Sequence, residues 1–150
     1  MPAPERIKHF IQNTLGCGCP DEVFRSIDVR RNVRLNSFIV LDSAFVIGNR
    51  LLVYLAEAGS AGCIEEHLPV LVAAGTKERD EKGLNRFRLV LISDRPADVQ
   101  QAAGKLFEEL RGNDGKVHLH VIDRTSLPFA ADFTENTEQR SDGRNKKERG

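Results

Sequence analysis

The chain has no excess charge of either sign, because its 22 Lys and Arg residues are balanced by 22 Asp and Glu residues. No overall electrostatic field draws it to a polyanion, so we expect neither nucleic acid nor a membrane as a partner. It also lacks a long apolar run, since the longest, Phe38 to Ala58, is broken by Asp42, Asn49 and Arg50. The N-terminus has no apolar signal region. We therefore predict a soluble, cytoplasmic protein whose partner is another protein or a second copy of itself.

Cysteine is scarce, with three residues in the whole chain. An odd number of cysteines in a cytoplasmic protein argues against a structural disulfide framework. We therefore expect reduced thiols, which serve as core residues, metal ligands or nucleophiles.

Hydrophobic periodicity predicts alternating strands and helices. The chain begins with a predicted helix from Pro4 to Leu15, a short helix from Pro20 to about Ser26 and an edge strand over residues 29–35. Two strands follow, over residues 38–47 and 51–55, joined by a tight turn at Gly48-Asn49. The rest is predicted as a helix from about Ala61 into the 70s, a charged connection over 77–83, a strand over 87–92, a helix after Pro96 and a last strand over 117–121.

This order of elements is typical of an α/β (or α+β) protein. Two consecutive strand–helix–strand units favour parallel pairing, while the Gly48-Asn49 hairpin adds an antiparallel strand. We predict a mixed β-sheet of about five strands flanked by helices. Residues 1–129 would form one domain. Residues 130–150 have almost no core-forming side chains and predict a disordered polar tail.

Two of the three cysteines, Cys17 and Cys19, are separated by one glycine ahead of a predicted helix start. Pro20 suits the first position of a helix, and Asp21 and Glu22 complement the positive end of a helix dipole. Cys19 would then lie at or near the N-cap. A thiol at that position is expected to be unusually acidic.

Several chemistries are open to this Cys-Gly-Cys turn. The two thiols could close a strained, labile disulfide and act as a redox couple, with Cys19 the more reactive thiol and Cys17 resolving it. They could instead supply half of a soft-metal site, zinc being the natural candidate, or Cys19 could act alone as a nucleophile. The plain alternative is that both are small turn residues packed under the first helix.

Further metal ligands are available elsewhere in the chain. Cys63 and His67 are four residues apart on a predicted helix, and His118 and His120 are two apart on a predicted strand, so each pair shares a face. Either pair could complete a tetrahedral site with the Cys-Gly-Cys turn. Alternatively, His67 belongs to an apolar helix face and the two strand histidines face solvent.

Two other features invite a ligand but have simpler explanations. Gly59-Ser60-Ala61-Gly62 resembles a phosphate-binding turn without the full glycine pattern or a P-loop lysine. Asp94 and Asp123 follow two predicted parallel strands, at the edge where α/β proteins often bind ligands, although Asp94 also suits a helix cap.

Three functional hypotheses follow. The first is a thiol centre that binds a soft metal or undergoes reversible oxidation. The second is a noncatalytic protein-interaction module with structural cysteines. The third is an enzyme working at the strand ends around Asp94 and Asp123. The sequence leaves open whether the protein is an enzyme.

Overall fold

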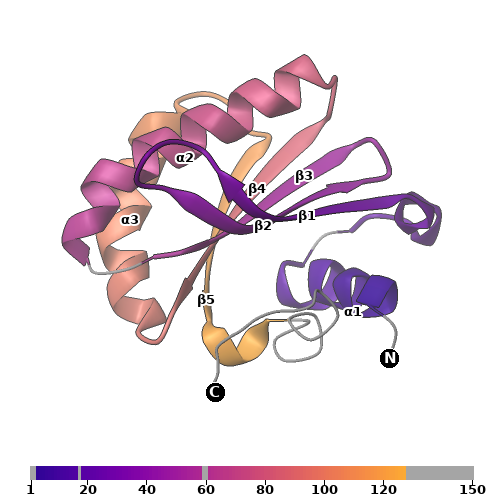
Figure 1. Ribbon diagram of the computed structural model, residues 1–150, viewed down its shortest axis with the longest axis horizontal. Helices are drawn as coiled ribbons and strands as arrows, with labels where there is room; N and C mark the ends of the chain where they lie inside the picture. The colour runs from indigo at the N-terminus through magenta and orange to yellow at the C-terminus, as the bar shows by residue number, and fades with distance from the viewer. Residues whose placement is uncertain (1–2, 17, 59–60, 128–150) are drawn as a thin grey trace. The chain divides into compact units, whose positions relative to one another are not determined.

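The computed structural model describes residues 3–16, 18–58 and 61–127 of the chain (Figure 1). The chain divides into two compact units. One is Pro20–Arg124, which contains the whole sheet, and the other combines Met1–Cys19 with Thr125–Gly150. The predicted tail, residues 130–150, lies outside the described residues.

The sheet has five strands, and their order in space follows their order in the chain. The strands are β1 (Ile27–Arg34), β2 (Val40–Ile47), β3 (Leu51–Glu57), β4 (Arg86–Ser93) and β5 (Val117–Asp123). The pairs β1–β2 and β2–β3 are antiparallel, whereas β3–β4 and β4–β5 are parallel. The predicted mixed α/β sheet is confirmed.

The turn between β2 and β3 forms at the predicted position. Gly48 and Asn49 both have positive φ, 61° and 56°, which is the backbone of a type I′ hairpin turn. The Arg50 amide closes the turn by donating to the Ile47 carbonyl at 3.1 Å. A Cβ at Gly48 would lie 2.5 Å from the Val23 side chain and carbonyl, so both backbone angle and space favour glycine there.

Two long helices, α2 (Ala61–Glu81) and α3 (Pro96–Arg111), pack side by side on one face of the sheet (Figure 1). The apolar core lies between them and the sheet. Within it the rings of Tyr54 and Phe87 meet edge to face, with centroids 5.0 Å apart. Gly75 of α2 lies against Phe87, and a Cβ there would approach the ring to 2.0 Å. The glycine thus lets this helix pack closely on β4.

The predicted charged connection over residues 77–83 is wrong, because α2 continues to Glu81. Its last turns are rich in charged residues, and these residues are held by ion pairs. Lys82 donates to Glu78 at 2.7 Å, four residues earlier, and Arg79 bonds Asp114 at 2.8 Å. The helix ends at Glu81, and Gly83, two residues later, has a φ of +67°, the left-handed conformation typical of the residue that follows a helix end.

Residues 3–14 form one helical segment close to the predicted one, but its geometry changes along its length. An α-helix, α1 (Ala3–His9), passes into a π-helical turn, η1 (Phe10–Thr14), in which the Leu15 amide donates to the Phe10 carbonyl at 3.1 Å. Gly16 follows with a φ of +73°.

Two short 3₁₀ segments complete the described fold. The short second helix is a 3₁₀ helix, η2 (Asp21–Arg25), and a further 3₁₀ turn, η3 (Arg124–Ser126), follows β5.

None of the helices that the structure describes combines the length and apolar content needed to cross a bilayer. The cytoplasmic location stays a prediction.

Candidate functional site

Cys19 is disulfide-bonded, whereas the sulfur of Cys63 is not part of a disulfide. The expectation that all thiols are reduced is therefore wrong for Cys19. Cys17 lies outside the described residues. The turn around Cys19 is open to solvent: Cys19 is half-buried, and Gly18 and Pro20 are exposed. The turn also contacts the first helical segment, because Gln12 donates to the Cys19 carbonyl at 3.4 Å. Packing of the turn under that helix stays a prediction.

The helix that follows Cys19 is shorter than predicted. Pro20 is the N-cap of η2, which has five residues and 3₁₀ geometry, so Cys19 lies one residue before the cap. The helix is short because Ser26 is already extended and β1 begins at Ile27. One 3₁₀ turn has a small dipole compared with a full α-helix. The helix dipole that would make a thiol at Cys19 unusually acidic is therefore small.

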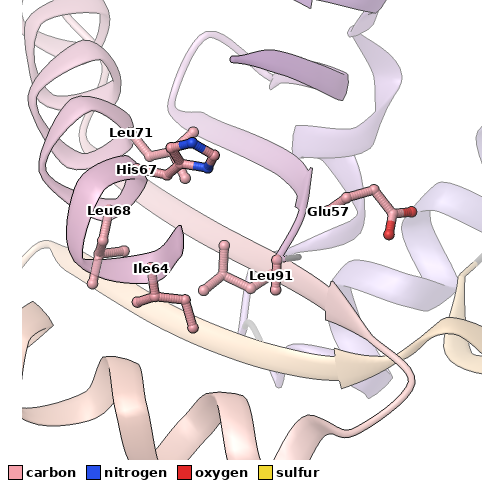
Figure 2. Close-up of a pocket in the computed structure, with 7 residues that line it drawn as sticks. Glu57, Ile64, His67, Leu68, Leu71 and Leu91 are labelled. Atoms are coloured by element: carbon pink, nitrogen blue, oxygen red, sulfur yellow. The ribbon is translucent and has the colours of Figure 1, made fainter. Parts of the chain in front are cut away.

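Cys63 and His67 lie one turn apart near the start of α2, as predicted. His67 contributes to a small cavity between α2 and the ends of β3 and β4, shown in Figure 2. Its lining residues are Glu57, Ala58, Ile64, His67, Leu68, Leu71 and Leu91. A volume of about 10 Å³ leaves room for roughly one water molecule. His67 is thus a half-buried side chain of an apolar helix face, and Glu57 points away from its ring (Figure 2).

His118 and His120 lie on β5 and share a face, but not the one that α2 and α3 cover. Their neighbours Val117, Leu119 and Val121 pack against the helix-covered core, so the alternating histidines project from the opposite face. They meet two side chains of β4 that the sequence analysis did not single out. The Nη1 atom of Arg86 lies 3.2 Å from Nε2 of His118, and that of Arg88 lies 2.8 Å from Nε2 of His120.

Burial, together with the neighbouring arginines, favours the neutral form of both histidines. Burial, followed by the positive charge of Arg88, lowers the pKa of His120 to about 4. Burial, Arg88 and Arg86 likewise lower the pKa of His118 below its usual value. A guanidinium can only donate, so Nε2 of each histidine accepts the hydrogen bond and Nδ1 carries the ring proton. The Nε2 lone pair that would bind a metal ion already accepts the hydrogen bond from the arginine.

Across residues 3–16, 18–58 and 61–127, no three His, Cys, Asp or Glu side chains lie close enough together to hold a metal ion. The two predicted ligand pairs each share a face of one element: Cys63 and His67 on α2, and His118 and His120 on β5. A zinc site at Cys17 and Cys19 stays a prediction, because Cys17 is not among the described residues.

The carboxyl ends of the parallel strands are joined by an ion-pair cluster. Arg124, just after β5, binds both carboxylate oxygens of Glu57, Oε1 at 2.7 Å, and donates to Asp94 at 3.1 Å. These bonds raise the pKa of the Arg124 guanidinium above its usual value. The predicted helix cap at Asp94 is wrong, because the N-cap of α3 is Arg95 and it has no side-chain cap bond. Ser93, the last residue of β4, accepts from the Arg95 amide at 2.9 Å in the turn before the helix. Asp123 is half-buried at the same edge. Residues 59–60 of the glycine-containing turn lie outside the described residues.

The arginines were the residues that sequence reasoning missed. The signal was present, because Arg86-Phe87-Arg88 and His118-Leu119-His120 are the same alternation on two consecutive strands. Parallel pairing in the observed register puts Arg88 directly opposite His118. Only the pairing of the two strands turns two separate patterns into one cluster.

Comparison with protein-family models, with curated proteins and with solved structures gave no match for this chain. What the molecule can do is therefore argued from its own residues.

Proposed function

We propose that the chain carries a reversible dithiol–disulfide couple formed by Cys17 and Cys19. The observation that supports the proposal is the state of the sulfurs: Cys19 is disulfide-bonded and Cys63 is not. The exposure of the neighbouring Gly18 and Pro20 gives a redox partner access to the turn. A disulfide across a single intervening residue closes a very small ring, and strained, exposed disulfides are more oxidising than structural ones.

The reaction is a thiol–disulfide exchange with an external dithiol. One thiolate of that dithiol attacks a sulfur of the Cys17–Cys19 bond, forms a mixed disulfide and releases the other sulfur as a thiolate. The second external thiolate then attacks the mixed disulfide. The chain gains two electrons and two protons, and the external dithiol becomes a disulfide.

This form of the hypothesis does not need an acidic Cys19 thiol. A five-residue 3₁₀ helix that begins after Pro20 supplies little stabilisation to a thiolate. Ring strain in the oxidised state instead drives the exchange. Which of the two sulfurs is attacked first is then decided by access to it.

To test this, the protein is equilibrated in dithiol–disulfide buffers of graded potential. Thiols are then trapped by alkylation, and the masses of the tryptic peptides are measured by mass spectrometry. We expect one two-electron transition at the peptide containing Cys17 and Cys19, with a midpoint above about −300 mV, because structural disulfides have potentials below that value. Cys63→Ser should keep the transition, and Cys17→Ser or Cys19→Ser should abolish it. A midpoint well below about −300 mV would make the bond structural and overturn the proposal.

The same sulfurs, once reduced, are the basis of the zinc hypothesis. Native mass spectrometry of the reduced protein with one equivalent of zinc checks it. One bound zinc in Cys63→Ser and in the native chain, lost in Cys19→Ser, would support metal binding at the turn. Zinc retained by Cys19→Ser would rule it out there.

A second candidate function, a noncatalytic interaction module, is favoured by a different observation. In the connection between β1 and β2, Phe38 is 85% exposed, and Val40 at the start of β2 is 43% exposed. Exposed large apolar side chains close together are typical of contact surfaces. If the partner is a second copy, sedimentation will detect concentration-dependent association that Phe38→Ser removes. A protein that stays monomeric at every concentration contradicts it.

A further inference from the structure

No strand that the structure describes pairs with the outer edge of β1. The strand order places β1 at one end of the sheet, with β2 on its inner side. The Gly48 amide donates to the Ser26 carbonyl at 2.7 Å, which orients Ser26 toward β2. Because neighbouring residues alternate in an antiparallel ladder, the backbone groups of Ile27 and Val29 point to the outer edge. Open edges of this kind are where a sheet can add another strand.

Two side chains of opposite charge, Asp28 and Arg30, flank Val29 on the same face of β1. Asp28 is exposed and forms no ion pair with a described residue. Arg30 donates to Glu78 at 2.5 Å, but Glu78 also accepts from Lys82 at 2.7 Å, so one carboxylate faces two cations. The Arg30 side chain stays 37% exposed, and its buried Nε has no acceptor among the described residues. Arg30 therefore has positive charge and donor capacity that Glu78 does not satisfy.

We propose that two copies of the chain pair through the outer edges of their β1 strands, antiparallel and centred on Val29. A two-fold axis perpendicular to the sheet then places Val29 opposite Val29 of the second copy, and the two residues exchange two backbone hydrogen bonds. Asp28 lies opposite Arg30 of the second copy in the adjacent pair, where side chains approach most closely. The exposed carboxylate thus meets the incompletely paired guanidinium, twice in each dimer.

Charge selects both the register and the second copy as the partner. A pairing centred on Asp28 or on Arg30 would place like charges opposite each other, which destabilises a cross-strand pair. The left-handed conformation of Asn32, with a φ of 53°, interrupts the regular strand beyond this stretch. A second copy carries the carboxylate and the guanidinium at the required spacing. The chain also has no net charge, so two copies do not repel each other overall.

This dimer goes beyond both proposed functions, because it needs neither the Cys17–Cys19 couple nor the Phe38 surface. Sedimentation of the full chain in reducing buffer should show a monomer–dimer equilibrium. Asp28→Lys should weaken the association by about tenfold or more, since the symmetry places the change in two pairs. Glu109→Lys, on the exposed side of α3, is the matched control and should leave the association unchanged.

Other outcomes of the sedimentation experiment would overturn the proposal. A chain that stays monomeric at every concentration has no such interface. A dimer that Phe38→Ser removes and Asp28→Lys keeps would place the contact at the Phe38 surface instead.

Cross-linking tests the register directly, in a Cys63→Ser background. Val29→Cys should form a disulfide between two copies on mild oxidation, because the axis brings the two Cα atoms to about 5.5 Å. Ile27→Cys is the matched control on the same strand face. In this register the two Ile27 positions are four residues apart along the strand, about 13 Å, which is too far for a disulfide. Equal cross-linking of the two variants, or none in Val29→Cys, would contradict the pairing.

Discussion

The hydroxyl of Tyr54 in β3 donates a 2.5 Å hydrogen bond to the carboxylate of Glu78 in α2. The same carboxylate accepts from Arg30 of β1 at 2.5 Å and from Lys82 at 2.7 Å. Burial, and then the bond to Glu78, raise the pKa of Tyr54 well above its usual value, so the hydroxyl stays a donor. Burial of Glu78 favours its neutral form, but its donors outweigh burial and lower its pKa. One carboxylate thus links two strands and a helix.

We expect Tyr54→Phe to destabilise the fold by about 1–2 kcal/mol, because the ring stays but a charged acceptor loses a donor. Glu78→Ala should cost about 2–4 kcal/mol, since it leaves a buried hydroxyl and the Arg30 guanidinium facing the vacated position. Urea unfolding of the two single variants and the double variant measures the coupling. Additive effects of the two changes would mean that the short bond contributes little.

Gly75→Ala and Gly104→Ala should change stability in opposite directions. Alanine is the better helix former by about 1 kcal/mol. At Gly75 the new methyl group would meet the buried ring of Phe87 at 2.0 Å, so we expect a net loss of about 2 kcal/mol or more. At Gly104 it would meet only the flexible end of Gln100 at 3.3 Å, and a gain of about 0.5–1 kcal/mol is expected. Thermal melts of both variants check the difference in sign.

Acid should weaken the bond between Arg79 and Asp114. Hydrogen bonds from Arg79 lower the pKa of Asp114, so its contribution is present above the unfolded pKa and is lost as pH falls through the folded value. Asp114→Asn should destabilise the protein by about 1 kcal/mol at pH 7 and by less at pH 3. Chemical unfolding at the two pH values measures both differences. A cost that does not change with pH would show that packing, not charge, is lost.

Protonation of His120 should also oppose folding. With a pKa of about 4 in the folded state and about 6.5 when unfolded, the unfolded chain binds the proton first as pH falls. Stability contributed by the neutral ring is full above pH 6.5 and declines down to about pH 4. Allowing for partial exposure, we expect a loss of about 2 kcal/mol across this window. His120→Gln should flatten the pH profile there, as measured by chemical unfolding at several pH values.

Strand and helix positions were predictable wherever the side-chain period agreed with local turn chemistry. The hairpin at Gly48-Asn49 is an example, because its residues tolerate positive φ and buried strands flank it. The end of α2 was not predictable in this way. Arg79 is 9% exposed because it bonds Asp114, 35 residues further along the chain. A partner that distant leaves no local pattern, so a charged helix end resembles a loop.

In the candidate sites too, local sequence predicted the positions of the residues but not the surroundings that the fold gives them. The sequence located the Cys-Gly-Cys turn, but oxidation is a state of the sulfurs and leaves no trace in residue order. It also identified His118 and His120 as a pair, though as metal ligands. Their environment is set by Arg88, which lies directly opposite His118 on the neighbouring strand. Two arginines beside the histidine pair occupy the Nε2 atoms that a metal ion would need.

The strand order has a consequence for how the molecule is made. Each strand is hydrogen-bonded to the strands that precede and follow it in the chain. The antiparallel pairs join strands of short sequence separation, which form contacts quickly, whereas each parallel pair must wait for the helix between its two strands. Since β5 is the last strand in the chain, the hydrogen bonds from Arg86 and Arg88 to His118 and His120 can form only after the other four strands have been synthesised.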